Sequence, residues 1–203
     1  MKDWNKLASK NVVEETIKSL KQRGIEASFV ETGKDANSRV LELIPKGAKV
    51  LASTSRTLDS IGLSEELENS SEFKSVRKEF MALNHDKDKE QIRRLRSTPD
   101  VIVGSVHAVT KDGKVLIASN TGSQLAAYVY GAGKVIWVIG VQKIVENFDD
   151  ATERIYKHVL PLESERLKGI YGVPSNVSKL LVIDKEVEPE RIKIIFVNEV
   201  LGF

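Results

Sequence analysis

The chain has 203 residues, of which 31 are Lys or Arg and 29 are Asp or Glu, so its formal net charge is +2. This balance excludes the global basic field typical of nucleic-acid-binding proteins, and a hydrophobic fraction of 41% excludes a disordered chain. The sequence contains no cysteine, which excludes disulfides, thiolate metal sites and Cys-ligated iron–sulfur clusters. At this length we expect one domain, over residues 1–203, with a substantial core.

The first residues, MKDWNKLASKNVVEE, lack the apolar core of a signal peptide. The longest apolar run, Val135–Val141, is too short to span a bilayer. We therefore expect no membrane span and a cytoplasmic location. The three histidines show no metal-ligand spacing, so we expect no metal site. The sequence leaves the oligomeric state open.

The first elements alternate between helix and strand signals. Apolar residues at three- and four-residue spacing predict a helix over about residues 4–23, which Gly24 would end. A strand at Ile25–Val30 follows, then a second helix that Asp35 could cap, and a short strand at Lys49–Ala52. This alternation is typical of a mainly parallel sheet covered by helices.

The segment that follows is more polar. Ser53–Thr57 leads into a predicted helix at about Leu58–Leu67, and Phe80–Leu83 is a possible strand. A charged helix is predicted at Lys87–Arg96, where basic residues alternate with acidic ones. Such mixed charge is typical of a solvated helix face.

The most informative segment is Val101–Lys143, where small polar groups stand between apolar runs. Val101–Val103 predicts a buried strand, and Asp112-Gly113 between apolar runs predicts a hairpin. A helix over Ser123–Tyr130 and a second buried strand at Val135–Ile139 complete the segment.

The turn Asn120–Gln124 has two interpretations. Thr121 and Gln124 have the T-x-x-Q spacing of a capping box, which places Thr121 at the N-cap of the helix. Capping could explain both residues fully. A capped helix start with Gly122 would also present free amides to an anion, and the surplus of polar side chains favours that second interpretation.

The C-terminal third again predicts helix and strands. Apolar spacing predicts a helix over Phe148–Val159 that stops before Pro161. The stretch His158–Ser178 has no clear period and is a candidate lid or interface loop. Two strands, Leu180–Ile183 and Ile192–Val197, follow an apolar pattern at the end of the chain.

Ligands of open α/β sheets lie beyond the carboxyl ends of the strands, so polar groups after these strands should converge on one cleft. The candidate ligand-binding residues are Ser55, Arg56, Ser105, His107, Asn120, Thr121, Gly122, Ser123, Gln124 and Lys143. Arg56, Lys143 and the helix amides favour an anionic ligand. His107 is the candidate for acid–base catalysis because a near-neutral pKa suits that task, although a structural role is the alternative.

Several segments together resemble the lactate-utilisation (LUD) domain family. They are SRTLDSIGL (55–63), VGSVHAVTKDGKVLIASNTGSQLAAYVYGAGKVIWVIGVQKIV (103–145), the helix with Ala151 and Arg154, and PERIKIIFVNEVLGF (189–203). The resemblance covers roughly residue 44 to the C-terminus. It implies a three-layer α/β fold, a mainly parallel sheet flanked by helices with a β-hairpin insertion, related to ribose-5-phosphate isomerases and CoA-transferases. It also implies a role in oxidising L-lactate to pyruvate beside iron–sulfur partner proteins.

Two functions remain open at this point. Without cysteine the chain resembles the small cluster-free subunit of lactate-oxidising systems, with no cofactor of its own and iron–sulfur subunits as partners. The alternative is a stand-alone enzyme or binding protein for a small anionic metabolite, a carboxylate or a phosphate. The related CoA-transferases use a Glu nucleophile, and no acid stands at Ser119-Asn120, where we would expect one. The sequence also lacks a dinucleotide fingerprint, so we expect the isolated chain not to be a dehydrogenase.

Overall fold

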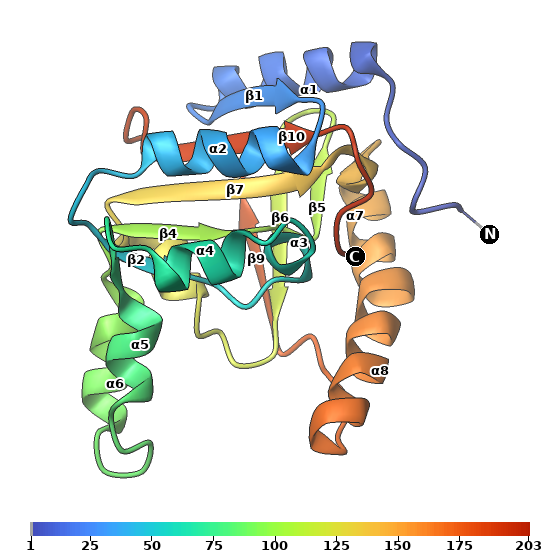
Figure 1. Cartoon of the computed structure of the whole chain (residues 1–203). Helices are drawn as coiled ribbons and strands as arrows, with labels where there is room; N and C mark the ends of the chain where they lie inside the picture. Colours follow the sequence, from blue (N-terminus) through green and yellow to red (C-terminus); the bar gives the residue numbers. More distant parts are fainter. Residues whose placement is uncertain (1) are drawn as a thin grey trace.

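The computed structural model describes residues 2–203 and is built around two β-sheets (Figure 1). The strands are β1 (Glu26–Val30), β2 (Lys49–Ala52), β3 (Lys74–Ser75), β4 (Val101–Gly104), β5 (Ala108–Thr110), β6 (Val115–Ser119), β7 (Lys134–Gly140), β8 (Ile144–Val145), β9 (Lys179–Ile183) and β10 (Ile192–Val197). Within the described residues, the large sheet has six parallel strands in the order β1-β10-β7-β4-β2-β3. The small sheet has the order β8-β5-β6-β9 and contains both parallel and antiparallel pairs.

Helices connect most of these strands. They are α1 (Lys10–Gln22), α2 (Gly33–Leu43), α3 (Arg56–Ser60), α4 (Leu63–Asn69), α5 (Val76–Met81), α6 (Lys89–Ser97), α7 (Phe148–Arg154) and α8 (Leu160–Tyr171). Two π-helical turns, η1 (Ala127–Gly131) and η3 (Ile155–Val159), and a 3-10 turn, η2 (Val141–Lys143), complete the set. In the described part of the chain, no helix is long and apolar enough to cross a membrane.

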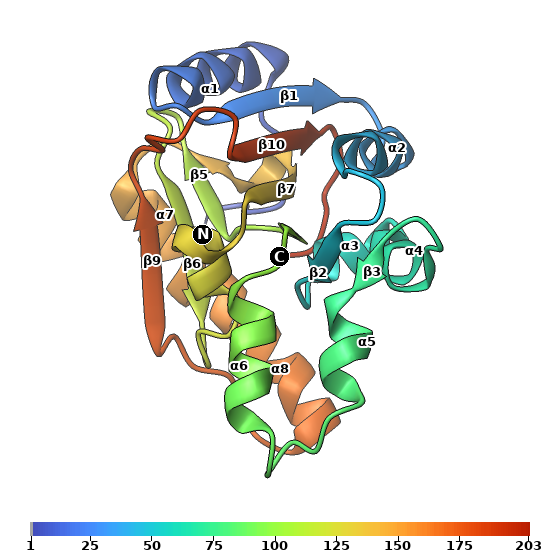
Figure 2. The ribbon, with the colours of Figure 1, turned by 90° about the vertical axis from the view of Figure 1, so that its left-hand side faces the viewer.

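The large sheet is covered on both faces. Helices α2, α3 and α4 pack on one face, while α1 and the small sheet cover the other (Figures 1 and 2). Helix α7 packs against the outer face of the small sheet. The predicted parallel α/β architecture is therefore confirmed, and the predicted Asp-Gly hairpin forms the centre of the small sheet.

The central strands are buried throughout. All four residues of β4 are buried, as are the six residues of β7 from Val135 onward. Strands that are covered on both faces bury both sets of alternating side chains, so they read as continuous apolar runs. This explains why these two strands could be predicted from the sequence.

The first helices begin at different residues from those predicted. Helix α1 starts at Lys10, not near residue 4, and Ser9 caps it. Trp4 instead packs with the core of the small sheet, so its spacing from the next apolar residues does not reflect a helix. In α2 the N-cap is Thr32, whose hydroxyl accepts a hydrogen bond from the Asp35 amide. The Asp35 carboxylate in turn accepts a hydrogen bond from the Thr32 amide. Asp35 is thus the N3 residue of a capping box and not the N-cap itself.

Two predictions in the polar segment are wrong. The helix expected at Leu58–Leu67 is divided into α3 and α4 at Gly62, whose φ of 72° lies in the left-handed region. The strand expected at Phe80–Leu83 is instead the end of helix α5. Helix α5 buries Val76 and Phe80 on one face, so Phe80 belongs to a helical spacing with Val76 and not to a strand over the apolar run Phe80–Leu83.

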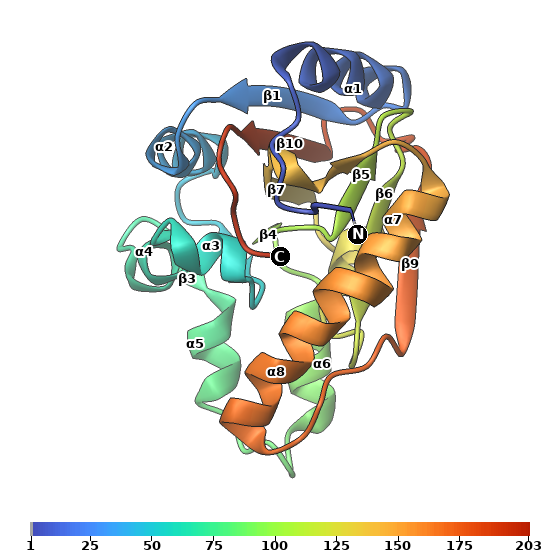
Figure 3. The ribbon, with the colours of Figure 1, turned by 90° about the vertical axis from the view of Figure 1, so that its right-hand side faces the viewer.

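The predicted helix stop at Pro161 is also wrong. Turn η3 and helix α8 continue from α7, so that one helical rod runs from Phe148 to Tyr171 (Figure 3). The Leu160 amide bonds the Ile155 carbonyl, five residues back, and this widened turn places Pro161 in the first turn of α8. A proline is tolerated there because its missing N–H is not needed. Most of the expected loop at His158–Ser178 is therefore helix.

Candidate functional site

A cavity of about 310 Å³ lies at the carboxyl edge of the large sheet. Its walls come from the segments that follow β2, β4 and β6, from η2 after β7, and from α5, α6 and α8. In Figure 1, α5 and α6 on one side and α8 on the other extend below the sheet as two arms. We call the space that these elements enclose the polar cavity.

The polar cavity is lined by nearly all of the candidate ligand-binding residues that were predicted from the sequence. Its lining includes Ser55, Arg56, Ser105, His107, Asn120, Thr121, Ser123, Gln124 and Lys143. Gly122 is the exception. The residues after β2, β4 and β7 meet because these parallel strands end at one edge of the large sheet, whereas the turn 120–124 reaches the cavity from the end of β6 in the small sheet. That they bind a ligand remains a prediction.

Lys143 is the most deeply placed charge in the lining. Its residue is 2% exposed, and Nζ donates hydrogen bonds to Thr57 Oγ1 at 2.9 Å and Ser105 Oγ at 3.2 Å. Within residues 2–203, no carboxylate forms an ion pair with it. Burial, and then the charge of Arg154, hold the pKa of Lys143 well below its usual range. We call Lys143, Thr57, Ser105 and His107 the lysine site.

Arg154 supplies a second buried cation behind the lysine site. It is fully buried, and one terminal nitrogen donates to the His107 carbonyl at 2.6 Å. Its Nε and its other terminal nitrogen have no partner among the described residues. Burial lowers the pKa of Arg154 to about 10. The buried Arg154 charge and the buried Lys143 amine, neither of them paired with a carboxylate in the described chain, together favour the binding of an anion.

His107 does not have the near-neutral pKa expected of an acid–base catalyst. Burial, followed by the charges of Lys143 and Arg154, lowers its pKa to about 3. Its Nδ1 accepts the Ala118 amide at 3.1 Å, so the neutral ring carries its proton on Nε2. At neutral pH, His107 is therefore a neutral hydrogen-bond donor, and a poor proton acceptor.

The predicted capping box in the turn after β6 does not form. Thr121 Oγ1 accepts the Ser123 amide at 3.3 Å, and the Gln124 side chain accepts from Ser119 Oγ at 3.1 Å. Regular helical structure is confined to the later residues, as η1. The Gly122 amide donates to Ser119 Oγ at 2.9 Å, so it is not free for an anion. The expected anion site at the Gly122 amides is thus wrong, and Lys143 is instead the main candidate group for binding an anion.

A tyrosine packs closely under the floor of the polar cavity. Tyr128 Oη donates to Ser53 Oγ at 3.1 Å, and burial raises the pKa of Tyr128 to about 12. Its ring meets Trp137 edge to face, with centroids 5.3 Å apart. A side chain at Gly104 would collide with both Tyr128 Oη and Ser53 Oγ. The glycine at the end of β4 is therefore required for this contact.

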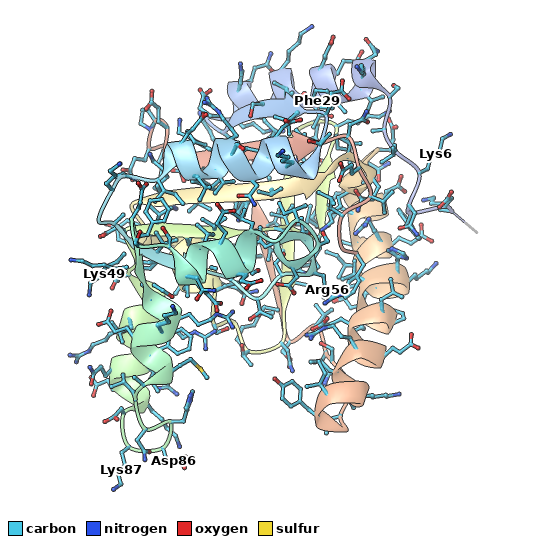
Figure 4. The ribbon with its side chains drawn as sticks, in the orientation of Figure 1. Lys6, Phe29, Lys49, Arg56, Asp86 and Lys87 are labelled. Carbon is cyan, nitrogen blue, oxygen red and sulfur yellow. The ribbon has the colours of Figure 1, made fainter. Side chains whose placement is uncertain are left out.

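Four arginines line the more exposed part of the polar cavity. They are Arg56 of α3, Arg77 of α5, Arg96 of α6 and Arg166 of α8. Figure 4 shows Arg56 between α3 and α8. Its side chain is 57% exposed, and its nearest carboxylate, Asp59, is 3.8 Å away. Arg166 is neutralised by a two-bond pair with Glu163, each bond 2.7 Å long.

Arg77 and Arg96 form the arginine pair of the polar cavity. Arg77 donates to Thr54 Oγ1 at 2.9 Å and lies 2.8 Å from a Glu68 carboxylate oxygen. The Arg96 guanidinium lies over the Phe80 ring, 4.9 Å from its centroid. Burial and the Arg77 charge lower the pKa of Arg96. The expectation that the Lys87–Arg96 helix is a solvated face is therefore wrong at Arg96.

The arginines of α5, α6 and α8 carried no recognisable signal in the sequence. Arg77, Arg96 and Arg166 stand among Lys and Glu residues on short helices, a pattern typical of surface. Their long side chains reach the cavity even though their helices lie at its rim. Among the described residues, no group of three or more His, Asp or Glu side chains could hold a metal ion.

The fold and the cavity together define an α/β protein with a cationic pocket at the carboxyl edge of a parallel sheet. The sequence profile of the LUD domain matches residues 13–197, so the chain belongs to the LUD domain family. The structure is similar to that of a DUF162 family protein from Deinococcus radiodurans, with 12% identity and a TM-score of 0.59. That match covers 95% of this chain and 100% of the other, which shows a shared fold.

Two further solved structures are similar over part of the chain. One is eIF2B beta from Chaetomium thermophilum, with 17% identity, a TM-score of 0.39, and coverage of 69% of this chain and 48% of that chain. The other is a D-ribose-5-phosphate isomerase in complex with phospho-erythronic acid, with 18% identity, a TM-score of 0.36, and coverage of 64% and 65%. A comparison with curated proteins gave no match.

Proposed function

We propose that this LUD-domain protein binds a small organic anion in the polar cavity, with Lys143 as its main charge partner. The observation that carries this proposal is the burial of Lys143 without a carboxylate partner in the described chain. An isolated buried ammonium is strongly unfavourable, so the free protein favours the neutral amine. A carboxylate or phosphate in the cavity would restore the charged form and supply its missing partner.

The groups around Lys143 suit such an anion. Ser105 Oγ and His107 Nε2 offer neutral hydrogen-bond donors beside the amine, and Arg154 adds positive potential from behind His107. A charge-assisted hydrogen bond in a desolvated pocket contributes about 1.5–3 kcal/mol. The lysine site would therefore discriminate anions from neutral molecules of the same shape.

Titration calorimetry with lactate, pyruvate, succinate and inorganic phosphate tests this proposal. We expect at least one anion to bind, and Lys143→Met to weaken that binding by about tenfold or more. Lys168→Met is the matched control, because it removes an exposed lysine of α8 that does not line the polar cavity. The proposal fails if the wild-type protein binds none of these anions, or if the two variants behave alike.

A second function is supported by family membership: a subunit of an L-lactate utilisation system acting with iron–sulfur partner proteins. Because the chain has no cysteine, it cannot ligate a cluster through thiolates, so partner proteins would perform the redox step. The isolated chain should then show no lactate-dependent dye reduction, whereas a mixture with iron–sulfur proteins encoded beside it should. Robust dye reduction by the isolated chain would contradict this assignment.

A further inference from the structure

The polar cavity is larger than a lactate-sized ligand. Its volume of about 310 Å³ corresponds to roughly ten water molecules at about 30 Å³ each. Lactate and pyruvate have six non-hydrogen atoms, which would fill at most about 180 Å³ even at the volume of one water per atom. A ligand that fills the cavity must therefore extend well beyond the lysine site.

The part of the cavity beyond the lysine site is also cationic. Arg96 is half-buried, its Nε is fully buried without a partner, and no carboxylate pairs with it in the described part of the chain. Phe80 holds the guanidinium from one side. A half-buried arginine without an anion is unfavourable in the free protein, as is the buried lysine.

Arg77 is fixed beside Arg96. Its terminal nitrogen donates to Thr54 Oγ1 at 2.9 Å and to the Ala52 carbonyl at 3.4 Å, at the end of β2. Glu68 neutralises Arg77 alone. Because Glu68 pairs only with Arg77, the positive charge of Arg96 stays uncompensated in the described chain, and planar guanidiniums match the oxygens of a carboxylate or phosphate.

The arginine pair and the lysine site are separate. Arg77 and Arg96 have contacts with Ala52, Thr54, Glu68 and Phe80, whereas Lys143 has contacts with Thr57 and Ser105. Both groups line one cavity. We propose that the ligand is a dianion, with one anionic group at the lysine site and a second, carboxylate or phosphate, at the arginine pair. This inference rests on the proposed function.

Matched pairs of ligands test the dianion directly. Butyrate and succinate differ by one carboxylate, and glycerate and 3-phosphoglycerate differ by one phosphate. In calorimetric titrations we expect one dianion to bind about tenfold or more tightly than its monoanionic partner. The pair with the larger ratio identifies the second group as carboxylate or phosphate. If each monoanion binds as tightly as its dianion, the inference is wrong, while the proposed function stands.

The variant Arg96→Gln tests whether the preference for dianions over monoanions comes from the arginine pair. We expect it to weaken dianion binding much more than monoanion binding and so to remove most of the dianion-to-monoanion ratio, while Lys143→Met weakens the binding of both ligands of a pair. Arg93→Gln is the matched control, since Arg93 is exposed on the same helix and does not line the cavity. Arg96→Lys keeps the charge and should retain part of the ratio.

The outcomes separate the two levels of the proposal. An equal loss for monoanion and dianion in Arg96→Gln would overturn the dianion inference. Absence of binding for all four ligands would overturn the proposed function itself. If Arg96→Gln does not fold, as judged by circular dichroism, the wild-type ratio and the Arg96→Lys variant still decide between these outcomes.

Discussion

The lysine site and the arginine pair are two cationic regions of one cavity, but the fold holds them in different ways. Lys143 lies on η2 directly after the central strand β7 and is almost completely buried. Arg77 and Arg96 extend from short helices at the rim, and the Arg77 side chain is 31% exposed. A lysine adjusts its protonation to burial, whereas a guanidinium stays charged. Between about pH 5 and about pH 9 we therefore expect pH to act on the lysine site and not on the arginine pair.

The largest effect should come from removing the lysine charge. Lys143→Met should weaken anion binding by about tenfold or more, yet leave the protein as stable as the wild type or more stable, because an apolar side chain replaces a buried amine without a carboxylate partner. Calorimetry and urea denaturation measure the two quantities. A loss of several kcal/mol in the free energy of unfolding would indicate that Lys143 stabilises the fold. It would contradict the assignment of Lys143 to anion binding.

The pH dependence of binding separates the two regions further. Because burial lowers the pKa of Lys143 in the free protein and an anion would raise it, binding should take up a proton between those two pKa values. Affinity should then fall as pH rises through this window, by up to about tenfold per pH unit. Titrations in two buffers of different ionisation enthalpy measure the proton uptake. Arg96→Gln should keep this dependence, and a proton uptake of zero in the wild type would contradict the assignment.

His107 should make the stability of the folded protein sensitive to acid. Its pKa is about 3 in the folded protein and 6.5 in the ordinary case, so the unfolded chain binds more protons between these values. Stability therefore rises with pH from about 3 to about 6.5, by up to about 1.4 kcal/mol per unit. His107→Asn keeps an acceptor for the Ala118 amide and should lose less stability than the wild type between pH 6.5 and pH 5. Equal losses in urea denaturation would show that His107 titrates normally.

The smallest effect concerns the turn after β6. Thr121→Ala should cost less than about 0.5 kcal/mol, because its hydroxyl accepts only the Ser123 amide and caps no helix. Ser119→Ala should cost about 1 kcal/mol, since it removes the bonds to Gly122 and Gln124. Urea denaturation of both variants checks the order. A larger loss of stability for Thr121→Ala would indicate that Thr121 caps the helix, as the sequence predicted.

The large sheet could be predicted because its central strands are buried on both faces and therefore leave uninterrupted apolar runs. Boundaries were lost where tertiary contacts override local spacing. Trp4 packs on the small sheet, and the widened turn before Pro161 lets a helix continue where local rules end it. Neither contact has a signature within a window of a few residues.

The candidate site was predictable where it follows strand ends and was missed where it comes from helices. Lys143 and His107 were placed in the cavity by the rule that parallel strands end at a common edge. Arg77 and Arg96 were missed, because whether a charged residue on a short helix points inward depends on how the helix is docked. The low pKa of His107 was missed for a similar reason, since it is caused by burial and then by two residues distant in the sequence, Lys143 and Arg154.

The position of β10 has a consequence for how the chain folds during synthesis. Among the described residues, strand β1 pairs only with β10, which follows all the other described strands in the chain. The edge of β1 that meets β10 therefore stays unpaired until Ile192–Val197 has been synthesised. Such late, long-range pairing is slow and leaves a strand edge open to other chains. Nascent chains of this protein should therefore depend on chaperones until β10 inserts between β1 and β7.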